Sequence, residues 1–556
     1  MASNPSPGAP PAPPPAPPAS PRERAVLDSA HVGDIKGAFG TIRQHEEAHR
    51  SLRSRALALL AIVGPGLIVM VGDNDAGGVA TYSQAGQNYG TSLLWVLLLL
   101  IPVLVVNQEM VVRLGAVTGV GHARLIKERF GPFWGWFSVI DLLVLNFLTV
   151  VTEFIGVSLA LGYFGVSKYV AVPIAAVALV AITSSGSFRS WERAMFVFVF
   201  ANVLMVPLFF FAHPHAAPIL HHFFVPGIQG GVTSTSVLLI IAIVGTTVAP
   251  WQLFFQQSNV IDKRITPRWI NYERIDTWIG AIVVVIGAAI LVCVSAFAFA
   301  GAPYAGHFKD AGVTAAGLDH TLGSTAGAFF ALVLLNASLI GAGALTLSTS
   351  YAFGDITGVK SSLHRSFREA KGFYALFSLV IVGAAAIVLI PGAPLGLITE
   401  VVQALAGVLL PSASMFLLLL CNDREVLGPW RNPSWLNVLA AVIVAVLVLL
   451  SMILMATTIF PHLNVTRFAL IGGAVMSAGL LAFGAVLSRS RGPRGKSRVP
   501  EVTYRVPKEQ WTMPPLALLA RPPASAARKW AMLTMEGYLL LAVVLLVVKG
   551  VQLAGG

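Results

Sequence analysis

A short acidic stretch interrupts the first long apolar segment of this 556-residue chain. The segment runs from about Leu57 to Tyr89, and residues 72–78 within it read Gly-Asp-Asn-Asp-Ala-Gly-Gly. Neither apolar half is long enough to cross the roughly 30 Å hydrocarbon core of a bilayer, whereas both halves together are. The pattern predicts one membrane-spanning helix that is broken near its middle. Two short segments joined by a solvated loop are the alternative.

The acidic residues in this break, Asp73 and Asp75, are candidates for a function. A charged side chain at mid-membrane depth costs roughly 2.5 to 3.5 kcal/mol on insertion scales. Such residues face a protein interior or a water-filled path and mark routes for ions. We therefore expect a cation pathway at this break.

The rest of the chain is also apolar, with 56% hydrophobic and 11% charged residues, and its apolar residues occur in long runs. This composition indicates a polytopic membrane protein. Thirteen candidate spans lie near residues 57–89, 91–112, 133–161, 168–184, 192–212, 233–258, 275–300, 325–354, 371–391, 396–421, 434–460, 465–487 and 532–553.

Lys and Arg are concentrated in alternate loops between these spans. The basic loops are residues 113–131, 185–193, 262–274, 360–371 and 488–508. The positive-inside rule places these loops and the N-terminus in the cytoplasm of a multi-pass protein of the cell membrane. The net charge of +12 thus reflects topology in a lipid bilayer and predicts no nucleic-acid partner.

The composition divides the chain into five parts. We expect a disordered Pro/Ala-rich cytoplasmic tail at 1–50, a transporter core at 51–430, additional transmembrane helices at 431–487, a basic cytoplasmic linker at 488–531 and a C-terminal transmembrane helix at 532–556. No nucleophile, nucleotide loop or hydrolase motif predicts an enzyme, and no resident cofactor is expected. The sequence does not define an oligomeric state.

A second interruption lies in the sixth span, where Gly245 to Gln252 read Gly-Thr-Thr-Val-Ala-Pro-Trp-Gln. Pro250 has no N–H for the preceding turn, so the helix must kink or unwind there. The first and sixth spans each open a group of five, and breaks at matching places indicate an inverted-repeat transporter with its substrate between them. Unwound backbone at this depth leaves carbonyl oxygens that can coordinate a cation.

These motifs resemble the NRAMP family of divalent-metal transporters. Members carry Gly-Pro-Gly, eight residues, and then Asp-Pro-Gly-Asn, and this chain has Gly64-Pro65-Gly66, eight residues, and Asp75-Ala76-Gly77-Gly78. The resemblance covers about residues 57–430. It implies an all-α polytopic membrane protein with a LeuT-type fold. That fold has two inverted five-helix repeats and broken first and sixth helices, here with two or three extra C-terminal helices.

The resemblance also implies a metal site. The family holds its ion with the Asp and Asn of the first motif, a carbonyl of the sixth helix and a Met thioether; the matching residues here are Asp75, Gly78, Thr246 and Ala249. Loss of the thioether and the retained oxygen ligands favour hard cations. Mg²⁺ keeps several of its waters when bound and would fit an enlarged site. The pattern is similar to the NRAMP-related magnesium transporters, although drift in an ordinary transition-metal carrier is the alternative.

Five further residues are candidate accessory groups. Asp73 and Asn74 add oxygen donors just before Asp75, while Trp251 and Gln252 follow the Pro of the sixth span. The fifth, Glu153, belongs to the proton route that the resemblance implies. That route has lost its His, here Trp251, and its Asp, here Val150, so groups that titrate near neutral pH are missing.

The function predicted from these observations is uptake of Mg²⁺, with Mn²⁺, by alternating access and without obligatory proton coupling. A proton-coupled Mn²⁺ or Fe²⁺ carrier is the main alternative. An organic-solute permease is disfavoured because two carboxylates would repel an anionic substrate. A receptor or scaffold with a vestigial site is the alternative from another class.

Overall fold

The structure, a computed structural model, describes residues 28–44, 51–392, 395–460, 463–490, 506–520, 528–530 and 532–538. Among these residues, ten helical segments are long and apolar enough to cross a membrane. The predicted polytopic helical protein is therefore confirmed. The last predicted span, 532–553, is described only as far as residue 538.

The ten segments comprise the following helices. They are α4 (Leu94–Thr118), α6 (Pro132–Tyr163), α8 (Phe188–Ala201) with α9 (Met205–Phe211), α11 (Ser234–Thr247) with α12 (Pro250–Asp262), α13 (Ile270–Ala298), α15 (Ser324–Thr357), α16 (Lys371–Val388), α17 (Leu395–Cys421), α19 (Ser434–Ile459) and α20 (Val465–Ser490). Shorter helices are α5 (His122–Phe130), α7 (Lys168–Thr183), α10 (Ala216–Phe224), α14 (Ala311–Leu322) and α18 (Arg424–Leu427).

The first span is broken twice, although the sequence predicts one break. It consists of α1 (Leu52–Ile62), α2 (Pro65–Gly72) and α3 (Ala76–Tyr89), and α1 and α2 meet at 48°. Gly64 between them has φ of 156°, which a residue with a side chain rarely adopts. The Asp276 carboxylate of α13 accepts the N–H groups of Gly64 (3.1 Å) and Gly66 (2.7 Å), which would otherwise lack partners.

The sixth span has its break where the sequence predicts it. The helix α11 ends at Thr247 and α12 begins at Pro250, whose fixed φ and missing N–H suit the first position of a helix. Val248 and Ala249 join the two halves in non-helical conformations, and Ala249 is extended. The prediction of broken first and sixth helices is therefore confirmed.

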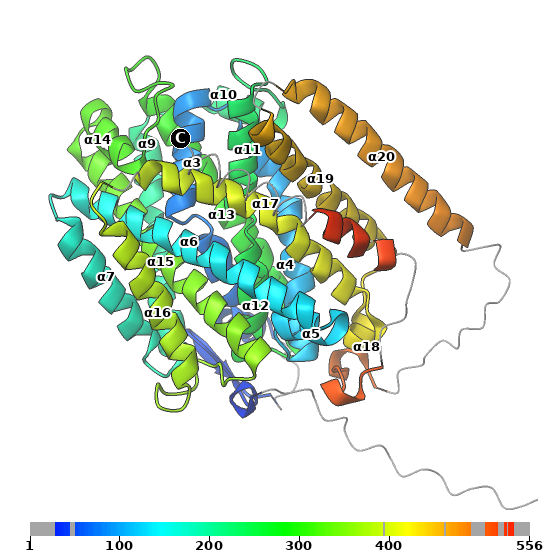
Figure 1. Cartoon of the computed structure of the whole chain (residues 1–556). Helices are drawn as coiled ribbons and strands as arrows, with labels where there is room; N and C mark the ends of the chain where they lie inside the picture. The colour runs from blue at the N-terminus through cyan, green and yellow to red at the C-terminus, as the bar shows by residue number, and fades with distance from the viewer. Residues whose placement is uncertain are drawn as a thin grey trace, which may run out of the picture.

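The two broken spans pack inside a frame of continuous helices. The long helices α6 and α15 lie side by side through the middle of the molecule, and α2 and α3 pack on α13 (Figure 1). At the margin, α20 packs against α19, while side chains such as Leu470 and Ile471 are 70% and 65% exposed. An apolar exposed face of this kind suits contact with lipid.

A β-hairpin forms part of the segment that the sequence predicts to be a disordered tail. Strands β1 (Ile35–Gly37) and β2 (Gly40–Ile42) pair in antiparallel register, after a short 3₁₀ turn at Ser29–His31. The hairpin closes one end of the helical bundle (Figure 1), which is called the hairpin end below. The prediction of disorder is wrong for residues 28–44, and residues 1–27 and 45–50 lie outside the described residues.

Part of the predicted basic linker, residues 506–520, also packs against the hairpin end. The Met513 N–H donates to the Val117 carbonyl (3.1 Å), and the Trp430 indole N–H donates to the Lys508 carbonyl (2.7 Å). Trp511 is 4% exposed. Through these contacts, this part of the linker packs against the ends of α4 and α18.

Candidate metal site

The two helix breaks face each other inside the bundle. A Cβ on Gly78 would lie 2.8 Å from the Asp73 carbonyl oxygen and 3.3 Å from Thr246 Oγ1 of the sixth span. Next to this contact, the Tyr82 hydroxyl and Thr247 Oγ1 form a hydrogen bond of 2.7 Å. The structure thus brings together the predicted residues of both breaks. It leaves less free space at Gly78 than the loss of an Asn side chain alone predicts.

Asp75 caps the first turn of α3. Its Oδ1 accepts the Gly78 N–H at 2.7 Å, and the side chain is 3% exposed. Asp is favoured at this position because its carboxylate satisfies a free N–H and complements the positive end of the helix. Gly341 of α15 allows close approach, since a Cβ there would lie 2.9 Å from the Asp75 Cβ. Asp75 is therefore fixed in the break by its own helix.

The preceding pair, Asp73 and Asn74, is also buried. Asp73 is 0% exposed, and neither carboxylate oxygen has a hydrogen-bond partner among the described residues. Asn74 donates to the Val284 carbonyl of α13 (3.1 Å), while its Oδ1 lacks a partner in the same part of the chain. Buried polar groups are normally paired, so these oxygens have unused capacity to coordinate a cation or accept a proton.

The sixth span contributes backbone and hydroxyl oxygens. The helical partner of the Thr246 carbonyl would be the N–H of residue 250, which is Pro and has none. Thr246 Oγ1 is buried and also has no partner among the described residues. Ala249 is 6% exposed and adds no ligand atom. Gln252 holds the break together, because its Nε2 donates to the Thr247 carbonyl at 3.2 Å.

A further polar side chain, Gln403 of α17, lies at the first break, and the sequence analysis missed it. A Cβ on Gly77 would overlap the Gln403 amide, so this side chain lies directly on the first turn of α3. Gln403 is 2% exposed, and its Nε2 has no partner in the described part of the chain. A lone Gln within the apolar run 396–421 was the available signal.

Glu153 supports the helix start. Its Oε2 accepts the Ala76 N–H at 3.0 Å, so Glu153 and Asp75 satisfy successive donors at the N-terminus of α3. Glu153 is 0% exposed, and a Cβ on Gly341 would lie 2.8 Å from its Oε2. Val150, one turn earlier, is a fully buried core residue. This arrangement gives Glu153 a clear role in holding the break.

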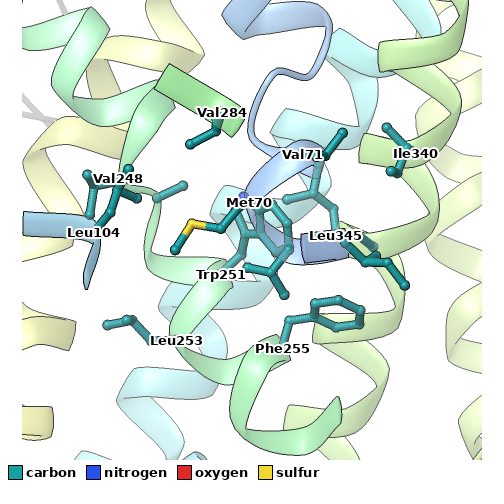
Figure 2. Packing of buried hydrophobic residues seen from close by; sticks show 14 of the residues in the cluster. Met70, Val71, Leu104, Val248, Trp251, Leu253, Phe255, Val284, Ile340 and Leu345 are labelled. Carbon is teal, nitrogen blue, oxygen red and sulfur yellow. The ribbon is translucent and has the colours of Figure 1, made fainter. Parts of the chain in front are cut away.

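Trp251 fills the space between the breaks and the hairpin end. Its ring packs among Met70, Leu345 and Phe255 (Figure 2), and the Trp251 and Phe255 ring centroids are 5.9 Å apart. A Cβ on Gly72 would lie 3.4 Å from the indole ring. These four side chains, called the apolar layer below, therefore separate the site from the hairpin end. The layer contains a Trp where the resemblance would place a titratable His.

A buried ion pair joins the hairpin to the neighbouring helices at the hairpin end. Lys263 is fully buried and donates to Glu192 Oε1 (2.6 Å) and to the carbonyls of Ile62 (2.6 Å) and Val63 (2.9 Å). Glu192 Oε2 in turn accepts the Ala38 N–H of the hairpin at 2.5 Å. The hairpin, the end of α1 and the sixth span are thus joined by one ion pair.

A second anchor holds the residues just before the hairpin. Arg365, in the loop after α15, pairs with Asp28. Burial raises the pKa of the Asp28 carboxyl. Hydrogen bonds from the Arg365 guanidinium and the Ala30 N–H together lower this pKa by more than burial raises it, so the pKa is below its usual value. The Arg264 guanidinium also donates to the Ala30 carbonyl at 2.9 Å.

The predicted ligand residues at the breaks, Asp75 and Thr246, offer oxygen atoms. Within the described residues, no group of three or more His, Cys, Asp or Glu side chains could hold a metal ion. A cation here would rely on Asp75 with carbonyl, amide and hydroxyl oxygens and with water. Hard cations such as Mg²⁺ accept this combination.

Comparisons with known proteins agree with this architecture. A family model described as natural resistance-associated macrophage protein-like (Nramp) matches residues 66–457. The divalent metal cation transporter MntH of Bacillus subtilis is 27% identical over 452 residues, covering 79% of this chain and 97% of that protein. The Erwinia tasmaniensis protein of the same name is 30% identical over 301 residues, covering 52% of this chain and 71% of that protein.

A solved structure has the same fold. The manganese transporter of Eremococcus coleocola aligns with a TM-score of 0.59 and 19% identity, covering 80% of this chain and 97% of that chain. The family match includes the second break of the first span and the break of the sixth span, and it extends through most of α19. The predicted family is confirmed, and its members are named as transporters and not as enzymes. The chain belongs to the Nramp family of multi-pass membrane proteins.

Proposed function

We propose that this chain is a divalent metal cation transporter that carries Mg²⁺, with Mn²⁺ as a second ion. The observation that carries the proposal is that the predicted ligand residues of the two breaks offer only oxygen atoms. Asp75 is held there, the helical donor position for the Thr246 carbonyl is Pro250, which has no N–H, and Ala249 replaces the thioether that the resemblance implies. Carboxylate and carbonyl oxygens suit hard cations, while a thioether suits softer ones.

The proposed metal site consists of Asp75, Gly78, Thr246 and Ala249. Asp75 and the Thr246 carbonyl supply ligands, while Gly78 and Ala249 leave the remaining positions to water. Asp73, Asn74 and Gln403 have polar atoms close to the same break that lack a partner among the described residues. Mg²⁺ binds proteins through one or two carboxylates and retains several waters, which fits this sparse set.

Transport proceeds by alternating access without obligatory proton coupling. The hairpin end faces the cytoplasm of the cell membrane, in accordance with the basic loops at that end. An inside-negative potential contributes about 2.3 kcal/mol per elementary charge per 100 mV, hence about twice that for a divalent ion. The apolar packing of Val150 and Trp251 supports a site that moves the cation without a relay of titratable groups.

A proton-coupled Mn²⁺ or Fe²⁺ carrier of the ordinary Nramp type is the second candidate. The relatives named divalent metal cation transporters support it, as does the manganese transporter whose fold this chain shares. Asp75 would serve either ion, so the candidates differ in what Ala249 and Trp251 have removed.

Ion uptake into liposomes that contain the purified full-length chain tests this proposal. Mg²⁺, Mn²⁺, Ca²⁺ and Cd²⁺ are compared under an imposed inside-negative potential, with an internal pH dye. We expect saturable Mg²⁺ and Mn²⁺ uptake above that of empty liposomes. Uptake of Mn²⁺ and Cd²⁺ alone, with internal acidification, would replace the first candidate with the second.

A further inference from the structure

Two guanidinium groups of α8 are held against the backbone of the β-hairpin. Arg189 donates its Nε–H to the Gly37 carbonyl (2.9 Å), and its Nη2 donates to Thr41 Oγ1 (3.3 Å). Arg193 donates its Nε–H to the Ala38 carbonyl (3.0 Å). Because residues four apart are neighbours on one helix face, both guanidinium groups are fixed on the same side of α8.

Lys36 adds a third positive charge to this side of the hairpin. Lys36 and Thr41 are partners across the two strands, and both residues are exposed, so their side chains lie on the same face. The hydrogen bond from Arg189 to Thr41 brings the guanidinium to that face as well. Lys36, Arg189 and Arg193 are called the cationic patch below.

The nearby carboxylates do not neutralise the cationic patch. None of its three side chains forms an ion pair within the described residues. Glu192 is buried and pairs with Lys263, and Asp34 accepts the Gln44 N–H at 3.3 Å. A guanidinium that is fixed through Nε keeps other N–H groups free for an anion, and its planar fork matches the oxygens of a phosphate.

An apolar stripe continues from the cationic patch along α8. Val197 and Phe200 follow Arg193 on the same helix face, and their side chains are 66% and 59% exposed. Helices α8 and α9 together are one of the segments long and apolar enough to cross a membrane. On the hairpin, Phe39 is 48% exposed and its ring centroid lies 4.6 Å from that of Phe196. Basic groups beside an exposed apolar face match the headgroup and the acyl chains of a phospholipid.

We infer that the cationic patch binds the phosphate of an anionic phospholipid whose acyl chains lie along Val197 and Phe200. The two Arg side chains provide the forks for the phosphate oxygens, and Lys36 adds charge. A soluble phosphate compound would leave the apolar stripe uncovered, which favours a lipid. The bound phosphate contacts the hairpin and α8 together and therefore strengthens the closure of the hairpin end. This binding does not depend on which ion the protein carries.

Thermal unfolding of the purified full-length chain in detergent, titrated with dioleoyl phosphatidylglycerol, tests this inference. A lipid that binds the folded state raises Tm with its concentration, which gives an apparent Kd. Lys36→Gln combined with Arg193→Gln removes two charges, while Arg189 keeps its hydrogen bonds to the hairpin. We expect the apparent Kd to rise about tenfold at low salt. The difference from the wild type should shrink near 1 M salt, where charges are screened beyond about 3 Å.

Arg424→Gln combined with Arg431→Gln is the matched control. Both residues are exposed at the same end of the molecule, on or next to α18, and neither forms an ion pair within the described residues. The apparent Kd of this variant should stay within about twofold of the wild-type value. An equal change in both double variants, or a wild-type Kd in Lys36→Gln with Arg193→Gln, would overturn the inference.

Two further titrations identify the source of the phosphate. Dioleoyl phosphatidylcholine has the same chains and no net charge and should raise Tm less, and glycerol 3-phosphate should leave Tm unchanged. Stabilisation by either compound equal to that by phosphatidylglycerol would exclude an anionic-lipid site. If the double variant does not fold, Lys36→Gln alone decides, because its side chain is exposed. Its apparent Kd should rise about threefold, and an unchanged Kd would contradict the inference.

Discussion

Asp75 combines two tasks that can be separated at the level of one residue. It caps α3 through the Gly78 N–H, and it is the carboxylate that the proposed metal site requires. We expect Asp75→Ala to lose Mg²⁺ transport and about 1 kcal/mol of stability, a typical value for loss of a helix cap. Asp75→Asn should lose transport but keep stability close to that of the wild type.

Liposome uptake and thermal unfolding in detergent measure these two effects independently. Undiminished Mg²⁺ uptake in a folded Asp75→Asn protein would remove Asp75 from the site.

Asp73 differs from Asp75 because Asp75 accepts the Gly78 N–H, whereas no hydrogen bond among the described residues holds the Asp73 carboxylate. The Asp73 side chain is 0% exposed and has no partner among the described residues. An unpaired buried carboxylate is costly, so Asp73→Asn should raise the thermal stability of the metal-free protein. If Asp73 contributes to cation binding, the increase in Tm that Mg²⁺ produces should also shrink.

Thermal unfolding with and without Mg²⁺ checks this prediction, and Asp319→Asn, at a half-buried position on α14, serves as a control for the loss of one charge. A variant whose Tm rises with Mg²⁺ as much as that of the wild type would assign Asp73 no part in binding.

Ala249 is the residue on which ion preference depends most directly. Ala249→Met restores a soft ligand, and Ala249→Leu adds similar bulk without sulfur. We expect the Met variant to favour Mn²⁺ and Cd²⁺ over Mg²⁺, while the Leu variant should reduce transport of all three.

Competition between Mg²⁺ and Cd²⁺ uptake in liposomes measures this preference. Adding Gly78→Asn should strengthen the shift, although its Cβ would lie 2.8 Å from the Asp73 carbonyl oxygen and requires local movement. Retention of the wild-type preference in both variants would contradict the chemistry proposed for the site.

At the scale of elements, the attachment of the hairpin to the helices depends on the buried Glu192–Lys263 ion pair. Lys263→Met leaves the Glu192 carboxylate buried without its partner. Loss of one member of such a pair costs about 3 to 5 kcal/mol. The double variant Lys263→Met with Glu192→Gln should recover part of this loss, because it removes the unpaired charge.

Chemical denaturation of the single and double variants measures the coupling between the two residues. Equal stability of both variants would show that the ion pair does not govern the closure of the hairpin end.

Some of the helix breaks could be predicted from local signals in the sequence. The breaks at Asp75 and Pro250 were predictable because a carboxylate and a missing N–H are local signals within apolar runs. The bend at Gly64 was missed: Gly64-Pro65 is a local signal for a helix start, but the Asp276 carboxylate that holds the bend lies 212 residues away. The sequence analysis also missed the hairpin and the position of Gln403, because both depend on contacts between distant segments: Ala38 with Glu192, and Gly77 with Gln403.

For the whole molecule, the central question is whether the cation moves with protons. The apolar layer around Trp251 and the buried Val150 remove two titratable positions, and Glu153 accepts a backbone N–H that Gln can also bind. An inside-negative potential should therefore drive Mg²⁺ into liposomes without internal acidification. A pH gradient alone should drive no Mg²⁺ uptake, and Glu153→Gln should retain more than half of the wild-type rate. Metal-dependent acidification that disappears in Glu153→Gln would place the protein among proton-coupled carriers, with Glu153 as the proton-carrying group.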